Sequence, residues 1–155
     1  MCKIGDIIVV KKYIGDDGKI VDKQHSFVVI DDNHDKIQGI EYDLVANVMS
    51  SFRDEEHRAK KLKYKENVEI TSNDIDNEKN NGKTGYIKAD QLYYFDKNNI
   101  DYYIFAHVDD YLLDELIRII IELRYENKIK MNTKNLNNGS KKTSKENNKE
   151  LVENR

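Results

Sequence analysis

The chain has 155 residues, enough for one domain with a modest hydrophobic core. Its formal net charge of -3 excludes a nucleic-acid binder that works through a global positive field, so any basic surface has to be a local patch. Cys2 is the single cysteine, which excludes an internal disulfide and agrees with a reducing compartment. Because no apolar run approaches the roughly 20 residues of a membrane span and no signal peptide is recognisable, we expect a soluble, cytoplasmic protein.

The N-terminal half reads as strands separated by polar turns. Apolar, β-branched runs predict strands at residues 5–13, 26–31 and 40–49. The second run is apolar on both faces, so we expect it at the centre of a sheet. Gly15 and Gly18 mark a turn, within a mobile loop or a long twisted hairpin. Residues 52–64 are densely charged and predict a solvated loop or a short helix.

The C-terminal half continues with strands and then changes its period. Further strands are predicted at residues 67–71, 86–95 and 100–108. From Tyr111 to Leu123 the apolar residues have helical spacing, and Asp109 or Asp110 can cap the helix. From Lys128 onward the composition is polar, which predicts a disordered tail over residues 128–155. The order of elements predicts a mainly β fold, a small curled sheet or barrel closed by one amphipathic helix.

The stretch from Gly85 to Phe95 sets polar groups into a buried strand. Successive side chains of a strand alternate between faces, so Tyr86, Lys88 and Asp90 are predicted to share one face. A cation and a carboxylate held side by side on a rigid support suit proton transfer or phosphate binding. A solvated ion pair on an edge strand has the same pattern.

Four motifs follow one another in a specific order. They are Gly5-Asp-Ile-Ile-Val-Val, Gln24-His-Ser-Phe-Val-Val-Ile30, Val45-Ala-Asn-Val-Met-Ser-Ser51 and Gly85-Tyr-Ile-Lys-Ala-Asp-Gln-Leu92. In this order they resemble the PemK/MazF family of toxin endoribonucleases from bacterial type II toxin-antitoxin systems. The resemblance covers residues 4–126, including the predicted helix, and leaves out the tail.

The resemblance implies both a fold and an activity. Residues 1–127 would form an SH3-like small β-barrel of the PemK/MazF type with a C-terminal helix, followed by the tail. The family forms homodimers, cleaves single-stranded RNA such as mRNA at short sequences without a metal or cofactor, and is neutralised by a cognate protein antitoxin. The residues carried over are Gly5 and Asp6 at the family's Gly-Asp, His25 at its arginine, Ser50 or Ser51 at its Thr or Ser, and Lys88-Ala-Asp-Gln91 at its Arg-x-Asp-Gln.

These residues form a chemically sufficient set for attack by the 2′-hydroxyl. That reaction needs a base, positive charge for the phosphate and an acid for the leaving 5′ oxygen. His25 can act as base or acid at neutral pH, which an arginine does poorly. Lys88 can hold the phosphate as a point charge, although it lacks the bidentate fork of arginine. Asp90 can orient the histidine or act as base, and Ser50 or Ser51 can donate to a phosphate oxygen or instead cap the next segment.

Residues around the proposed groove are candidates for binding RNA. Lys12, Lys19, Lys23 and Arg53 can steer the RNA backbone, or form a solvated face. Tyr86 can stack on an unpaired base, or pack in the core. The scattered histidines and acidic pairs show no metal-ligand spacing, so we predict no metal site and no cofactor.

Two other classes of function stay open at this point. One is an SH3-like module that binds RNA or protein without catalysis, which the changes from arginine to His25 and Lys88 would permit. The other is a toxin acting on DNA-related machinery, for which a Mg²⁺ requirement or a duplex substrate would be the sign. The antitoxin is implied by the family resemblance, and a groove carrying His25 and Lys88 suits an acidic amphipathic peptide that competes with RNA for the same cations.

Overall fold

The structure, a computed structural model, describes residues 2–76 and 84–136. Its helices are α1 (Glu55–Lys61) and α2 (Asp110–Tyr125), with 3-10 turns η1 (Ser72–Asp74) and η2 (Lys97–Asn99). Its strands are β1 (Asp6–Val10), β2 (Tyr13–Ile14), β3 (Ile20–Val21), β4 (His25–Asp31), β5 (Asp35–Ile37), β6 (Ile40–Tyr42), β7 (Leu44–Ser51), β8 (Asn67–Ile70), β9 (Ile75–Asp76), β10 (Gly85–Phe95), β11 (Tyr102–Val108) and β12 (Lys130–Asn132).

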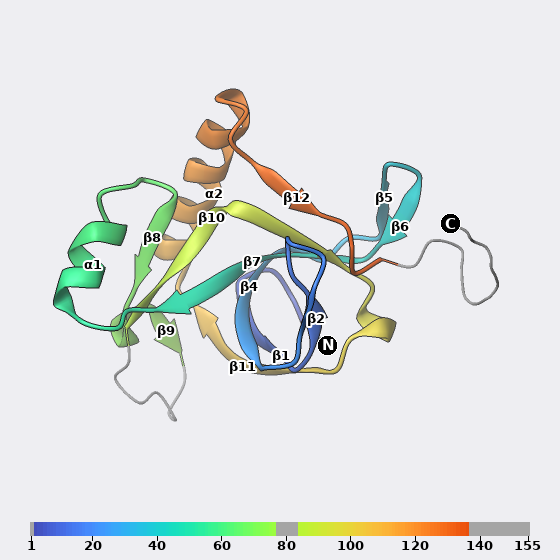
Figure 1. Cartoon of the computed structure of the whole chain (residues 1–155), viewed down its shortest axis with the longest axis horizontal. Helices are drawn as coiled ribbons and strands as arrows, with labels where there is room; N and C mark the ends of the chain where they lie inside the picture. Colours follow the sequence, from blue (N-terminus) through green and yellow to red (C-terminus); the bar gives the residue numbers. More distant parts are fainter. Residues whose placement is uncertain (1, 77–83, 137–155) are drawn as a thin grey trace.

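One curled sheet carries most of these strands (Figure 1). Within the described residues its order is β12-β10-β7-β4-β1-β11-β9, and β8 pairs with the start of β10. The pairs are antiparallel except for β10 with β12. The two hairpins β2–β3 and β5–β6 stand apart from this sheet. The prediction of a mainly β fold with a curled sheet and a helix is confirmed.

Strand β4 lies at the centre of the sheet, between β1 and β7, as its apolar sequence predicted. Its alternating side chains enter two separate cores: Phe27 and Val29 pack with Ile8 and Phe95, whereas Val28 packs with Ile7. The first core fills the inside of the curl, and the second lies beneath α2. Both faces of the strand are therefore buried at these residues, which explains why polar and apolar residues do not alternate there.

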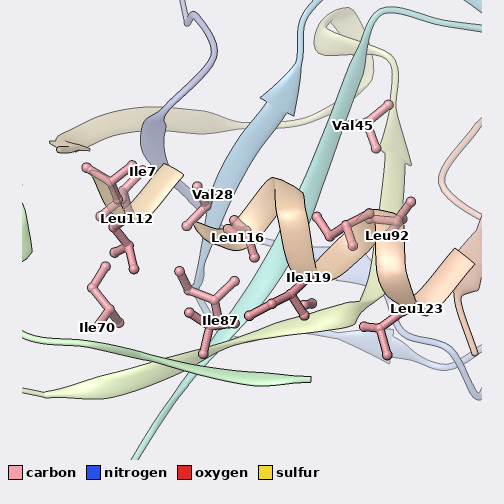
Figure 2. Packing of buried hydrophobic residues seen from close by; sticks show 14 of the residues in the cluster. Ile7, Val28, Val45, Ile70, Ile87, Leu92, Leu112, Leu116, Ile119 and Leu123 are labelled. Carbon is pink, nitrogen blue, oxygen red and sulfur yellow. The ribbon is translucent and has the colours of Figure 1, made fainter. Parts of the chain in front are cut away.

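Helix α2 closes the second core (Figure 2). Asp109 is its N-cap and accepts a hydrogen bond from the backbone N–H of Leu112 at 2.9 Å, so the prediction of a cap is confirmed. The helix buries one stripe of side chains, Leu112, Leu116, Ile119, Ile120 and Leu123. Figure 2 shows members of this stripe facing Ile7, Val28, Ile70 and Ile87 of the sheet.

Two predicted elements differ in the structure, and the charged region is the short helix that was one of its two predicted alternatives. The run at residues 40–49 is divided, because Ile40–Tyr42 pairs with β5 in a hairpin and β7 begins only at Leu44. The charged region after it contains the short helix α1, capped by Asp54. The prediction of disorder from Lys128 is wrong for the described part of that tail, where Lys130–Asn132 forms β12 on β10 and Leu136 is buried. The rest of the tail lies outside the described residues.

The Gly-Asp pair at the start of β1 has a structural role. Asp6 is buried, and its Oδ1 lies 2.9 Å from Nδ1 of His107 on β11. Gly5 has a φ of +93°, and a Cβ there would lie 2.7 Å from the His107 ring. The motif therefore joins β1 to β11. Across the described residues, no helix has both the length and the apolar character that crossing a bilayer demands.

Candidate functional site

His25 is the first residue of β4 and lies at the edge of the curl. Its Nδ1 is 3.3 Å from the carbonyl oxygen of Lys23. Its ring meets the ring of Tyr13 edge to face, with the centroids 5.7 Å apart. Burial and the neighbouring Tyr93 and Asp16 raise the pKa of Tyr13 to about 12, so this tyrosine stays protonated beneath the imidazole.

Two cavities meet at His25. The first, of about 430 Å³, is lined by Lys23, Ser51 and Thr84 among others. The second, of about 330 Å³, is lined by Tyr13 and Lys88 among others. His25, Met49 and Ser50 line both cavities. The imidazole and one serine therefore stand on the wall between two hollows.

The serine pair is held at the end of β7, which pairs with the start of β10. Ser50 lies opposite Tyr86, and Ser51 lies opposite Gly85. A Cβ on Gly85 would lie 2.4 Å from the carbonyl oxygen of Ser50, so only glycine permits this approach. Because α1 is capped by Asp54, neither serine is its cap. Ser50 lines both cavities and Ser51 only the first, which favours Ser50 as the residue nearer to Lys88.

Lys88 reaches the second cavity from a bulge in β10. Met49 pairs with Ile87, whereas Asn47 pairs with Leu92, so residues 88–91 face only Val48 of β7. The side chain of Asn47, which is fully buried, fills this bulge. Its Nδ2 lies 3.0 Å from the carbonyl oxygens of Lys88 and Gln91, and 3.3 Å from that of Ala89.

Lys88 and Asp90, which strand alternation places on one face, both lie in this bulge. Asp90 lines neither cavity, and it forms no salt bridge with Lys88. Burial raises the pKa of Asp90, with Glu66 adding to the rise, while its own backbone N–H, Lys130 and Lys88 oppose it. The described structure therefore places His25 and Lys88, but not Asp90, on the walls of these cavities.

The five candidates for binding RNA are dispersed. Lys23 lines the first cavity, whereas the exposed Lys12, Lys19 and Arg53 line neither. Tyr86 is only 3% exposed, and its ring stacks on Phe52 with the centroids 5.1 Å apart. This packing leaves no open face for a base, so the alternative of a core residue is the correct one for Tyr86.

Asn47 is a site-supporting residue that the sequence reading missed. It is the single polar side chain in the run from Leu44 to Val48, and its Oδ1 has no hydrogen-bond partner in the described structure. An amide within an otherwise apolar strand was the available signal, because a buried polar group has to satisfy other polar groups. Here it satisfies the carbonyls that the bulge removes from the sheet.

The arrangement supplies a titratable nitrogen, a hydroxyl and an ammonium around an open hollow, together with further donors from Lys23 and Thr84. Within residues 2–76 and 84–136, no cluster of three or more His, Cys, Asp or Glu side chains is placed to hold a metal ion. The set suits proton transfer and the binding of an anionic group such as a phosphodiester.

Comparisons with protein-family models, with curated proteins and with solved structures found no match to this chain. The family resemblance consequently rests on the four motifs and on the residues that they bring together.

Proposed function

We propose that this protein is a sequence-specific endoribonuclease toxin that cleaves single-stranded RNA by attack of the 2′-hydroxyl. The observation that carries the proposal is the position of His25 and Ser50 on the wall shared by two cavities, with Lys88 in the second. These three residues lie in the second, third and fourth motifs of the PemK/MazF resemblance. Residues far apart in the sequence thus converge on the second cavity, which in this proposal receives the phosphodiester.

In this proposal His25 is the general base. A proton on Nδ1 donates to the carbonyl oxygen of Lys23, which leaves Nε2 to take the proton of the 2′-hydroxyl. The 2′ oxygen attacks phosphorus, the bond to the 5′ oxygen breaks, and a 2′,3′-cyclic phosphate and a 5′-hydroxyl result. Ser50 donates to a non-bridging oxygen. Lys88 stabilises the phosphate charge and supplies the proton of the leaving oxygen.

The test is cleavage of a long single-stranded RNA by the purified full chain in EDTA. His25→Ala and Lys88→Ala should each lower the rate by roughly 10²–10⁴-fold, the range for a group that transfers a proton in the transition state. His34→Ala and Lys36→Ala are the matched controls, because both residues are exposed and line neither cavity. Unchanged cleavage in the site variants would place the chemistry elsewhere. Tight RNA binding without cleavage would indicate a non-catalytic module.

A cognate antitoxin and a homodimer belong to the same proposal. The cations Lys23 and Lys88 on the cavity walls suit an acidic amphipathic segment that competes with RNA. Co-purified antitoxin should therefore block RNA binding, and His25 and Lys88 should become protected from solvent in the complex. An antitoxin that inhibits while the cavities still bind RNA would contradict this competition.

A further inference from the structure

A third cavity, of about 330 Å³, lies beyond the second. Asp16, Gln91 and Tyr93 line both the second and the third cavity. The third is completed by residues of the C-terminal segment, Lys130, Met131, Asn132 and Lys134. Since the first two cavities share His25 and Ser50, the three cavities are neighbours in a row, with the second between the other two.

The segment that completes the third cavity is firmly held. Strand β12 pairs in parallel with β10, with Lys130 opposite Gln91 and Asn132 opposite Tyr93. Beyond it, Asn135 binds both backbone groups of Ile14: its Oδ1 accepts from the N–H at 2.7 Å, and its Nδ2 donates to the carbonyl at 3.0 Å. The lysines of this segment therefore project from fixed backbone, which lowers the entropy lost when they bind a ligand.

The wall of the third cavity is rich in donors. Its lining holds two lysines and one carboxylate, that of Asp16, and the carboxylates of Asp17 and Asp90 lie near enough to act on Tyr93 and Lys130. Lys130 is exposed and forms no salt bridge with a described residue. Lys134 donates to the backbone oxygen of Asp16 at 2.5 Å, and its ammonium keeps two further protons. Burial raises the pKa of Tyr93, which therefore remains a hydroxyl at neutral pH.

We propose that the third cavity is a phosphate subsite, in which Lys130 and Lys134 bind the RNA backbone on one side of the bond that His25 and Lys88 cleave. This inference rests on the proposed function and extends it, because both lysines lie outside residues 4–126, where the family resemblance ends. A strand lying along the three cavities meets Lys23, Lys88 and then Lys130 and Lys134. The C-terminal segment thus lengthens the recognised RNA.

The test compares two RNA lengths on the full chain. The probes are 2′-O-methylated, uncleavable single strands of about three and about twelve nucleotides, so that only the longer one spans all three cavities. Lys130→Ala/Lys134→Ala should bind the long strand roughly tenfold more weakly at low salt, and the slope of log K against log salt should fall by about 0.7 per lost phosphate contact. Its affinity for the short strand should equal that of the wild type.

Lys36→Ala/Lys128→Ala is the matched control, because it removes the same charge from exposed residues outside the three cavities. Lys130→Gln/Lys134→Gln removes the charges but keeps most of each aliphatic side chain, so it separates the loss of charge from the loss of packing. Equal binding of the long strand by the cavity variants and the control, with cleavage intact, would overturn the subsite alone. A wild-type protein that neither binds nor cleaves RNA would overturn the proposed function, and the subsite with it.

Discussion

Nδ1 of His25 lies 3.3 Å from the carbonyl oxygen of Lys23. Because a carbonyl only accepts, this hydrogen bond needs the proton on Nδ1 and leaves Nε2 of the neutral ring as an acceptor. The edge-to-face contact with Tyr13 fixes the plane of the same ring. Backbone and aromatic contacts together hold the tautomer that a general base at Nε2 requires.

His25→Asn should separate this structural contact from the chemistry. The amide of asparagine can still donate near the position of Nδ1, but it has no basic nitrogen. We expect cleavage to fall by roughly 10²–10⁴-fold while the thermal midpoint remains that of the wild type. Cleavage assays in EDTA and circular dichroism measure the two effects, with His34→Asn as the control. A lower midpoint with undiminished cleavage would make His25 a structural residue.

The sequence predicted the main strands and α2 because their signals are local: β-branched runs, helical spacing and a capping aspartate. It placed Lys88 and Asp90 on one face because alternation assumes regular pairing. The bulge that contains both residues arises from the register between β7 and β10, and that register is fixed by contacts between distant segments. Composition alone could not show that the side chains of Asn132 and Asn135 bind a hairpin more than a hundred residues earlier.

Asn47→Ala should weaken both the fold and the site. The substitution leaves three backbone carbonyls of the bulge without their buried donor, and we expect a loss of about 1–3 kcal/mol in the free energy of unfolding. Cleavage should also fall, since Lys88 projects from that bulge. Urea unfolding measures the stability, and the exposed Asn98→Ala serves as control. A variant as stable as the wild type would show that the bulge does not depend on Asn47.

Asn135→Ala should loosen the β2–β3 hairpin, which contributes Tyr13 to the second cavity. The two hydrogen bonds from Asn135 are lost, and only the carbonyl of Ile14 keeps a donor, Nδ2 of Asn132 at 3.1 Å. We expect the unpaired N–H of Ile14 to cost about 1–3 kcal/mol of local stability. The amide of Ile14 should then exchange its hydrogen faster, and KM for RNA should rise more than kcat falls. Hydrogen exchange by NMR measures the first effect, with Asn33→Ala as control. Unchanged protection of Ile14 would show that other contacts hold the hairpin.

Asp90→Asn should leave cleavage intact, because Asp90 lines neither cavity beside His25. Burial raises the pKa of this carboxyl above its value in the unfolded chain. The native state therefore binds the proton more tightly than the unfolded chain does. The resulting stabilisation is fully present below the pKa of Asp90 in the unfolded chain, and it is lost as the pH rises through the pKa of Asp90 in the native state. The neutral asparagine has no charge to desolvate, so this variant should not share that loss.

The measurement is urea unfolding of wild type and Asp90→Asn from about pH 4, where carboxyl groups titrate, to neutral pH, which lies above that range. The stability of the variant relative to the wild type should rise with pH and be greatest at neutral pH. Asp101→Asn, at an exposed position, is the control for the loss of one negative charge. A variant that loses stability at neutral pH would show that the ionised carboxylate makes favourable contacts. A variant that loses cleavage at unchanged stability would show that Asp90 takes part in the cleavage reaction.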